Sequence, residues 1–342
     1  MVMSKKILSP VLLGALTLSL EGCYKDIDLE KYRPDPVIVV NSAVSPDSTI
    51  MASVTHTWFY AGTEAFVERY VNLSKARVEL FVNDEFREVM QWKQYLPADT
   101  QNEVPDSVFM SHIKPKEGDR IKLVVSADGY QTVTAETCVP KRVPVVLAEC
   151  TGVSERINPQ GNIGDGYGNT IPYNYYALTY RLAFRDEEDE DNYYALTFLR
   201  QDDFYGTWYH PHIETSDPVL SENMDALDGA VGFDGMNTGA CFLFTDRQIA
   251  GKQYTLSFEE WTGSYDNPDS PPLTVRLYSL SEDYYRYLFS VSQIAGSTLD
   301  EALGNLGFGE PLRVYSNVEG GTGILGACCV SEKKVKGLTP SV

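Results

Sequence analysis

The chain has 342 residues, of which 28 are basic and 48 acidic, and its net charge at pH 7 is −20. A chain this acidic is repelled by nucleic acid and by anionic lipid, which argues against both as partners. An apolar fraction of 43%, with 22 tyrosines and 14 phenylalanines, indicates packed cores rather than disorder.

The N-terminus has the layout of a secretory signal peptide, residues 1–22. Lys5 and Lys6 precede a mostly apolar run over residues 7–20, which is shorter than the ~20 residues that a membrane-spanning helix needs. A glycine stands immediately before Cys23, which is the pattern of a lipoprotein cleavage site. The sequence therefore predicts cleavage before Cys23 and its acylation, because several acyl chains anchor a protein stably whereas one does not. The alternative is an ordinary cleaved signal peptide with Cys23 as a structural thiol.

The mature chain is predicted to begin with an acidic tether over residues 23–36. Without the signal peptide, it carries 26 basic and 47 acidic residues, for a net charge of −21. Residues 24–30 (Tyr-Lys-Asp-Ile-Asp-Leu-Glu) resemble the lysine-and-acid export signals that place Bacteroidota lipoproteins on the outer face of the outer membrane, although Ile27 interrupts the acids. We therefore expect a lipid-anchored outer-membrane protein that faces the cell surface. The alternative is a periplasm-facing anchor on a plain solvated tether.

Residues 37–142 are predicted to form an immunoglobulin-like β-sandwich. Short runs of β-forming residues, separated by turn residues and without long helical periodicity, are typical of its strands. One run ends at Asn83-Asp84, which is a hairpin signal. The runs cover residues 37–40, 50–56, 77–82, 120–126 and 130–137. Pro140, Pro144 and the non-periodic stretch that follows to residue 170 mark the expected domain boundary.

Residues 143–342 are predicted to form a larger β-rich domain with one packed α-helix, so the expected fold class is mainly β. Two of its runs, rich in aromatic residues, are joined across an acidic turn. The expected strands cover residues 175–184, 193–199, 240–244, 253–258, 273–278 and 324–330.

The helix is expected near residues 282–295. Residues 279–282 (Ser-Leu-Ser-Glu) have the form of a capping box. Larger apolar residues then recur at helical spacing, at Tyr284, Leu288, Val291 and Ile294. Residues with this spacing more often pack against a sheet than bind a ligand. We therefore interpret the tyrosines of this helix as packing residues and expect the face of Tyr284, Leu288 and Val291 to lie on the C-terminal sheet.

Five cysteines remain once the acylated one is set aside, and an odd number leaves at least one thiol unpaired. Cys138 and Cys150 flank the expected boundary and are a candidate pair. Adjacent Cys328 and Cys329 point to opposite faces of a strand, which argues against a bond between them. None of the five, Cys241 included, has the spacing of a zinc site. The sequence leaves the pairing open, and buried thiols are the default interpretation.

Two motifs contain the residue types of a metal site. Residues 186–191 are six consecutive acids, and calcium binds several carboxylates at once. This run lacks a glycine that would let the backbone wrap an ion, so we favour a solvated hairpin tip. His210 and His212 lie on one side of an extended segment, a spacing that suits a transition metal. The alternative is an exposed loop, and we predict no metal and no other cofactor.

The segment 204–212 combines four large aromatic residues with two histidines and few aliphatic residues. This composition is poor core material, but it suits a ligand site or a partner interface, where aromatic anchors carry much of the binding energy. We predict that the segment is a contact surface. Its candidate contact residues are Phe204, Tyr205, Trp208, Tyr209, His210 and His212.

The chain lacks the common catalytic motifs. It has no Gly-x-Ser-x-Gly elbow, no His-Glu-x-x-His and no phosphate-binding glycine loop. Its four histidines, at positions 56, 112, 210 and 212, have no recognisable catalytic context. Glycoside hydrolysis needs two neighbouring carboxylates, and any chain with 47 acidic residues will contain such a pair. The acidic residues alone therefore do not indicate an enzyme. We therefore expect a protein without catalytic residues.

Four stretches of the chain carry a family resemblance, and they follow one another across nearly the whole mature sequence. They are residues 37–42, 72–78, 281–288 and 315–321, the last followed by Gly323, Ile324 and Gly326. On these stretches the chain resembles the uncharacterised, domain-of-unknown-function lipoproteins of Bacteroidota that are often encoded beside SusC-like TonB-dependent transporters. The helix stretch and the Ser-Asn-Val of residues 316–318 are the most specific. The family has no established catalytic or ligand residues, so the resemblance implies only a surface lipoprotein that works near a nutrient transporter.

We therefore expect a non-enzymatic accessory or substrate-capture component of a TonB-dependent uptake system. Its expected partners are the outer membrane, through the lipid anchor, and a SusC-like transporter. The alternative is a structural or adhesive surface lipoprotein that binds another macromolecule and has no transport role. A surface hydrolase is a third hypothesis.

Overall fold

The structure is a computed structural model that describes residues 31, 33–59, 72–95, 106–164, 170–187, 191–201, 208–220, 241–262, 271–296 and 313–337. The chain forms two units, one of Met1–Asp35 with Trp58–Glu68, and one of Pro36–Thr57 with Arg69–Val342. In the first unit, the guanidinium carbon of Arg33 lies 5.4 Å from the centre of the Phe59 ring. The strands and helices described below belong to the second unit.

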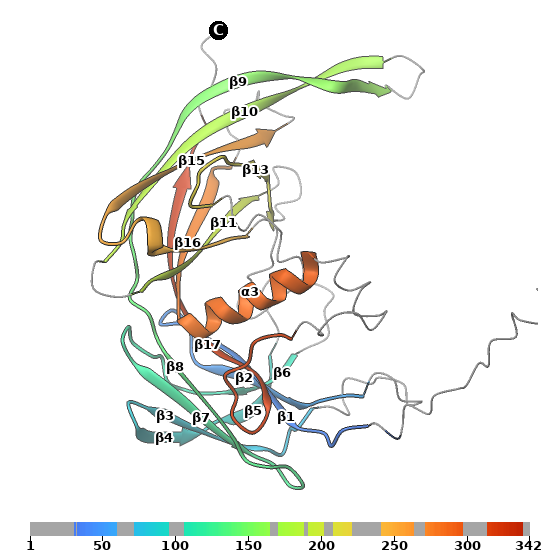
Figure 1. The fold of residues 1–342 in the computed structure, drawn as a ribbon, viewed down its shortest axis with the longest axis vertical. Helices are drawn as coiled ribbons and strands as arrows, with labels where there is room; N and C mark the ends of the chain where they lie inside the picture. Colours follow the sequence, from blue (N-terminus) through green and yellow to red (C-terminus); the bar gives the residue numbers. More distant parts are fainter. Residues whose placement is uncertain are drawn as a thin grey trace, which may run out of the picture. The chain divides into compact units, whose positions relative to one another are not determined.

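The described part of the second unit contains three sheets and one α-helix (Figure 1). The nine-stranded sheet contains β1 (Ile38–Val44), β2 (Met51–His56), β5 (Gln91–Tyr95), β6 (Asp106–Met110), β11 (Tyr193–Gln201), β12 (Trp208–Tyr209), β14 (Cys241–Thr245), β16 (Leu273–Leu280) and β17 (Thr322–Val335). One four-stranded sheet contains β3 (Arg77–Val82), β4 (Glu85–Val89), β7 (Arg120–Ser126) and β8 (Val133–Cys138). The other contains β9 (Val145–Gly164), β10 (Thr170–Arg185), β13 (His212–Glu214) and β15 (Gln253–Thr262). The helix α3 spans Glu282–Gly296, and the 3-10 helix η3 spans Asp246–Gln248. The predicted mainly-β class is confirmed.

The nine-stranded sheet joins the two ends of the sequence. Its strands follow the order β12-β11-β16-β17-β1-β2-β6-β5, and β14 also pairs with β11. The strands β1 and β17 run parallel, with Ser42 aligned with Leu325, whereas the other strand pairs are antiparallel. This sheet therefore includes strands from both sides of residue 142, and a division into two domains at that position is not confirmed.

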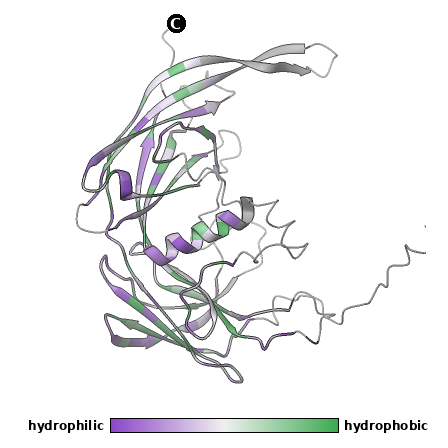
Figure 2. Ribbon diagram, viewed as in Figure 1, coloured by the Kyte–Doolittle hydropathy of each residue, from purple (hydrophilic) through white to green (hydrophobic). Residues whose placement is uncertain are grey.

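A β-sandwich core lies between the nine-stranded sheet and the sheet of β3, β4, β7 and β8, and β17 contributes to it beside strands of residues 37–142. Alternate residues of β1, β3 and β7 are buried, as a strand with one face in a core requires. Ile38 and Val40 of β1 belong to the same buried cluster as Leu80 of β3 and Leu123 of β7. Figure 2 shows hydrophobic and hydrophilic residues following one another along these strands.

The hairpin predicted at Asn83-Asp84 joins β3 to β4. Both residues have positive φ, 54° and 65°, which is the conformation that a tight two-residue hairpin turn requires and that Asn and Asp adopt most readily. The Asn83 Oδ1 also accepts the backbone N–H of Arg120 at 2.9 Å. The turn is therefore tied to the neighbouring strand β7.

The non-periodic stretch after Pro144 was expected to help mark a domain boundary near residues 140–150, and its described part, residues 145–164, is a strand. This long strand, β9, pairs with β10 along most of its length and is interrupted by three register shifts. Ladder hydrogen bonds to β10 hold this strand although its sequence lacks a clear two-residue period.

A second core lies between the sheet of β9, β10, β13 and β15 and the nine-stranded sheet, and it is rich in aromatic residues such as Tyr180, Phe198 and Phe258.

The predicted helix is confirmed and packs on the nine-stranded sheet. Tyr284 and Leu288 are buried, and Val291 is partly buried against the same cluster, which includes Ile324 and Cys328 of β17. The odd-numbered neighbours on β17, from residue 325 to residue 329, belong to the core of the sandwich instead. Because successive side chains of a strand point to opposite faces, α3 covers the face of β17 opposite to the sandwich.

The helix begins at Glu282, as predicted, but its N-cap lies two residues later than the first serine of the capping-box motif. Ser281, not Ser279, precedes the first turn, and its Oγ accepts the backbone N–H of Tyr284 at 3.4 Å. The same Oγ accepts the N–H of Ala327 at 3.1 Å, which ties the start of α3 to β17. Ser279 lies in β16, where its Oγ accepts the N–H of Val143 at 3.3 Å.

The five cysteines form no disulfide in the structure. Cys241, Cys328 and Cys329 are buried, as expected, and burial raises the pKa of the Cys241 thiol to about 12. Cys138 is exposed and Cys150 is partly exposed, so the default interpretation of a buried thiol is wrong for these two residues.

In the described part of the chain, no helix is both long enough and apolar enough to cross a membrane.

Candidate functional site

The described part of the predicted contact surface begins with β12. Trp208 and Tyr209 form this strand at the edge of the nine-stranded sheet, where they pair with Gln201 and Arg200 of β11. The two aromatic residues are 48% and 45% exposed. Phe204 and Tyr205, also predicted contact residues, lie outside the described residues. The structure therefore places two of the large aromatic side chains on the surface, and their role in contacts stays a prediction.

The two histidines of the segment are held by different sheets. The Nδ1 of His210 lies 2.8 Å from the carbonyl oxygen of Phe198 in β11. His212 lies in β13, where its ring packs edge-on against Trp261 with 5.6 Å between the ring centres. Its Nε2 is 3.6 Å from the Glu214 carboxylate. The described residues contain no group of three or more His, Cys, Asp or Glu side chains that could hold a metal ion.

Beneath this edge lies a buried ion pair between β11 and β15. The Nη2 of Arg200 donates to Oε2 of Glu260 at 2.7 Å, and its Nε donates to Oε1. Tyr180 completes the cluster, because its hydroxyl accepts from Arg200 Nη2 at 3.0 Å and donates to Glu260 Oε2 at 2.8 Å. The side chains of Arg200 and Glu260 are only 11% and 1% exposed. This cluster links the two sheets that carry β12 and β13.

The electrostatics of this cluster favour its ionised form. Burial alone lowers the pKa of the Arg200 guanidinium, but the hydrogen bonds and the charge of Glu260 outweigh burial, so the pKa is raised. Burial and then the charge of Glu260 raise the pKa of the Tyr180 hydroxyl. Arg200 therefore stays charged and Tyr180 stays protonated, which suits a structural support better than proton transfer.

The described acids of the run 186–191 make structural contacts. Asp186 is buried, and its carboxylate accepts from the Tyr194 hydroxyl at 2.5 Å and from the Gly251 N–H at 2.8 Å. Burial raises the pKa of Asp186 in spite of these two bonds. Glu187 pairs with Lys141 at 2.9 Å. Residues 188–190 lie outside the described residues, so the solvated tip stays a prediction.

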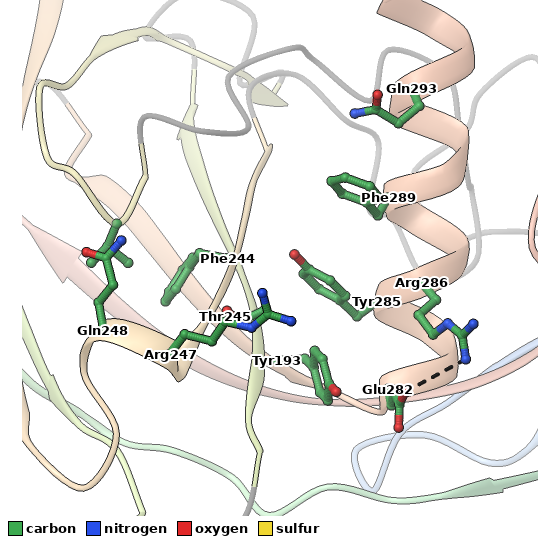
Figure 3. Close-up of a pocket in the computed structure, with 11 residues that line it drawn as sticks. Tyr193, Phe244, Thr245, Arg247, Gln248, Glu282, Tyr285, Arg286, Phe289 and Gln293 are labelled. Atoms are coloured by element: carbon green, nitrogen blue, oxygen red, sulfur yellow. Dashed lines mark ion pairs between the residues drawn. The ribbon is translucent and has the colours of Figure 1, made fainter.

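A pocket of about 580 Å³ lies between α3, β14 and η3. Figure 3 shows Tyr285, Phe289 and Gln293 pointing from the helix toward the side that carries Phe244 and Arg247. This volume is within the range of about 300–1,000 Å³ that is usual for small-molecule sites. The sequence did not predict the pocket, because its described lining comes from four stretches of the chain that lie far apart in sequence.

The helix face at this pocket is aromatic. The rings of Tyr285 and Phe289 are 6.1 Å apart with 15° between their planes, and Tyr193 lies 5.0 Å from Tyr285. Tyr284, one residue earlier, is fully buried in the cluster between the helix and the sheet. Interpreting the helix tyrosines as packing residues is therefore right for Tyr284 and incomplete for Tyr285, which packs against the core and also lines the pocket.

Comparison with curated proteins gives no match. One family model does match, a domain of unknown function (DUF4249), and it covers residues 25–334. The match includes every strand of the three sheets except the final residue of β17, together with α3. Because the model spans far more than half of the sequence, the chain belongs to the DUF4249 family.

Proposed function

We propose that this protein is a non-enzymatic lipoprotein, anchored in the outer membrane through Cys23 and facing the cell surface. It would serve as an accessory or substrate-capture component of a TonB-dependent nutrient uptake system. The sequence layout around Cys23 supports the anchor, and the resemblance to lipoproteins encoded beside SusC-like transporters supports the transport role.

The observation that carries the capture role is the exposure of Trp208 and Tyr209 at a sheet edge, at 48% and 45%. Large aromatic side chains are usually placed in a core, because burying them contributes more to stability than burying almost any other residue. Tryptophan and tyrosine are also the residues most enriched among the anchors of protein interfaces. The buried Arg200–Glu260 pair holds β11 to β15, so the exposed aromatic pair stands on a well-supported strand.

The test of the transport role is co-purification. The tagged full-length protein is extracted from its native cells with mild detergent, and the proteins that accompany it are identified. A large TonB-dependent β-barrel in near-stoichiometric amount supports the proposal. A different macromolecule in its place supports the structural or adhesive alternative, and hydrolysis of a polymer by the purified protein supports the surface hydrolase.

The anchor is tested separately. Cells grown with a fatty-acid analogue should label the wild-type protein and leave Cys23→Ala unlabelled, because Cys23 is the proposed acylation site. Protease added to intact cells should degrade the wild type. Equal labelling of the two proteins would exclude acylation at Cys23, and full protection from protease would place the protein on the periplasmic side.

A further inference from the structure

The pocket beside α3 carries positive charge in a strongly acidic protein. Among the described residues that line it, three are charged, Arg247, Arg286 and Glu282, and their charges sum to +1 while the whole chain carries −20. The Glu282 carboxylate lies 3.8 Å from the Arg286 guanidinium, which partly offsets both charges. Arg286 also stacks on the Tyr315 ring at 4.3 Å. Within the described lining, the positive charge that Glu282 does not offset is therefore that of Arg247.

Arg247 is exposed and belongs to η3. Among the residues that the structure describes, it forms no ion pair with a carboxylate, although the chain has many more acids than bases. Figure 3 shows its guanidinium directed toward Tyr285 and Tyr193, into the space between the two walls. A guanidinium presents parallel N–H donors that match the two oxygens of a carboxylate. The pocket therefore offers a binding group for an organic anion.

The opposite wall offers a surface for a flat, weakly polar ring. Tyr285 and Phe289 lie nearly parallel, one helical turn apart, and Phe289 is 37% exposed. The face of an aromatic ring is negative and attracts the slightly positive C–H groups of a sugar ring. A platform of two such rings suits a pyranose better than a narrow apolar chain.

Two amide side chains complete the lining, Gln248 from η3 and Gln293 from α3. An amide both donates and accepts hydrogen bonds, which matches hydroxyl groups that do the same. Figure 3 shows the two amides on opposite sides of the pocket. A purely apolar anion such as a fatty acid would gain no hydrogen bond from either of these exposed amides, whereas a sugar would.

We propose that this pocket binds a carboxylate-bearing sugar, a uronic acid unit of an acidic oligosaccharide. The sugar ring would lie on Tyr285 and Phe289, and its carboxylate would bind Arg247. This assignment rests on the proposed capture function and names its class of ligand. It is tested with the purified chain alone, so its failure and a failure of the transporter co-purification are separate results.

The test is isothermal titration calorimetry of the full-length, detergent-solubilised protein with trigalacturonic acid. The wild type should bind, and Arg247→Gln should weaken binding by at least about tenfold, because a charge-assisted contact is lost. The matched control is Arg181→Gln, which removes an exposed guanidinium in β10 that lies 3.6 Å from Glu149. It should change the affinity by less than about twofold. Equal effects of the two variants would overturn the proposal.

The aromatic platform is tested with a second pair of variants. Phe289→Ala should also weaken binding of trigalacturonic acid by at least about tenfold, whereas Phe86→Ala, which truncates a 51% exposed phenylalanine on β4, should not. The neutral trisaccharide maltotriose should bind at least about tenfold more weakly than the acidic one. Absence of heat from trigalacturonic acid at millimolar concentration, or equal affinity for the two sugars, would overturn the assignment. Circular dichroism of each variant confirms that it is folded.

Discussion

The ring of Tyr284 on α3 lies directly against Gly326 of β17. A Cβ added to Gly326 would stand 2.4 Å from Cδ2 of that ring, well inside van der Waals contact. The helix can therefore approach the sheet this closely only because position 326 has no side chain. Tyr284 is completely buried at this contact, as are its neighbours in the cluster under the helix.

We predict that Gly326→Ala destabilises the protein by about 1–3 kcal/mol, the usual cost of inserting a group into a well-packed core. The ring of Tyr284 is in the core and cannot swing away as an exposed side chain would. Urea unfolding followed by tryptophan fluorescence gives the difference in the free energy of unfolding. Gly152→Ala is the matched control, because its added Cβ meets only Thr179, at 3.8 Å. Equal stability of the two variants would show that α3 is not docked at this distance.

The buried pair of Arg200 and Glu260 leads to a second prediction. Arg200→Met leaves the Glu260 carboxylate buried without its counter-ion, which should cost about 3–5 kcal/mol of stability. The double variant Arg200→Met with Glu260→Leu replaces both charges by apolar groups and should recover most of that loss. Equilibrium unfolding of the single and double variants measures both effects. A double variant as unstable as Arg200→Met would mean that the hydrogen bonds to Tyr180 and Pro271, not the ion pair, stabilise this region.

The third prediction concerns acid stability and Glu88. Burial acts to raise the pKa of this carboxyl, but hydrogen bonds from Ser111 and His112 outweigh it, so the pKa is lowered from 4.5. The backbone N–H of His112 donates to Glu88 Oε1 at 2.7 Å. Because the folded state favours the ionised form, Glu88 contributes stability at pH values above 4.5, and this contribution is lost as the pH falls through the lowered pKa.

Glu88→Gln should therefore be less stable than the wild type at neutral pH, and the difference should shrink as the pH falls below 4.5. Urea midpoints of both proteins between neutral and acidic pH measure the difference. A difference that stays constant with pH would show that the glutamine loses packing rather than an ionic hydrogen bond.

Sequence patterns predicted the elements whose signal is local. The two-residue alternation in Arg77–Val82 and the tight turn at Asn83-Asp84 depend on neighbouring residues, and the structure has both. The helical spacing of Tyr284 and Leu288 likewise identified α3 and its buried face. In each case, apolar residues recur within a short run of sequence at the period of a strand or a helix, and this period indicates which face is buried.

The features that the sequence did not predict depend on contacts between distant segments. The parallel pairing of β1 with β17 joins residues almost a full chain length apart, and no local pattern specifies a strand's neighbour. Arg200 is the penultimate residue of an apolar strand, and the neighbouring sequence gives no sign that Glu260 will neutralise its charge. The pocket needs Arg247 and Tyr285 to meet across two elements, so it becomes visible only once the fold is known.

The last prediction concerns Trp208, the exposed aromatic residue of β12. Because Trp208 is 48% exposed and lies in a two-residue edge strand, Trp208→Ala should lower the melting temperature by much less than truncation of a fully buried aromatic residue would. Truncating an interface anchor typically costs about 2 kcal/mol or more, so capture of the partner should fall at least about tenfold. The measurement is the amount of β-barrel protein that co-purifies per tagged chain, beside a melting curve for the same variant.

Phe86→Ala is the control for Trp208→Ala, since Phe86 is 51% exposed but lies on β4, in a different sheet from β12. It should retain wild-type capture and wild-type stability. If Trp208→Ala lowers the melting temperature while capture is unchanged, Trp208 is a packing residue and the segment is not the contact surface. If both variants weaken capture equally, the effect comes from general surface hydrophobicity rather than from an anchor at the edge of the nine-stranded sheet.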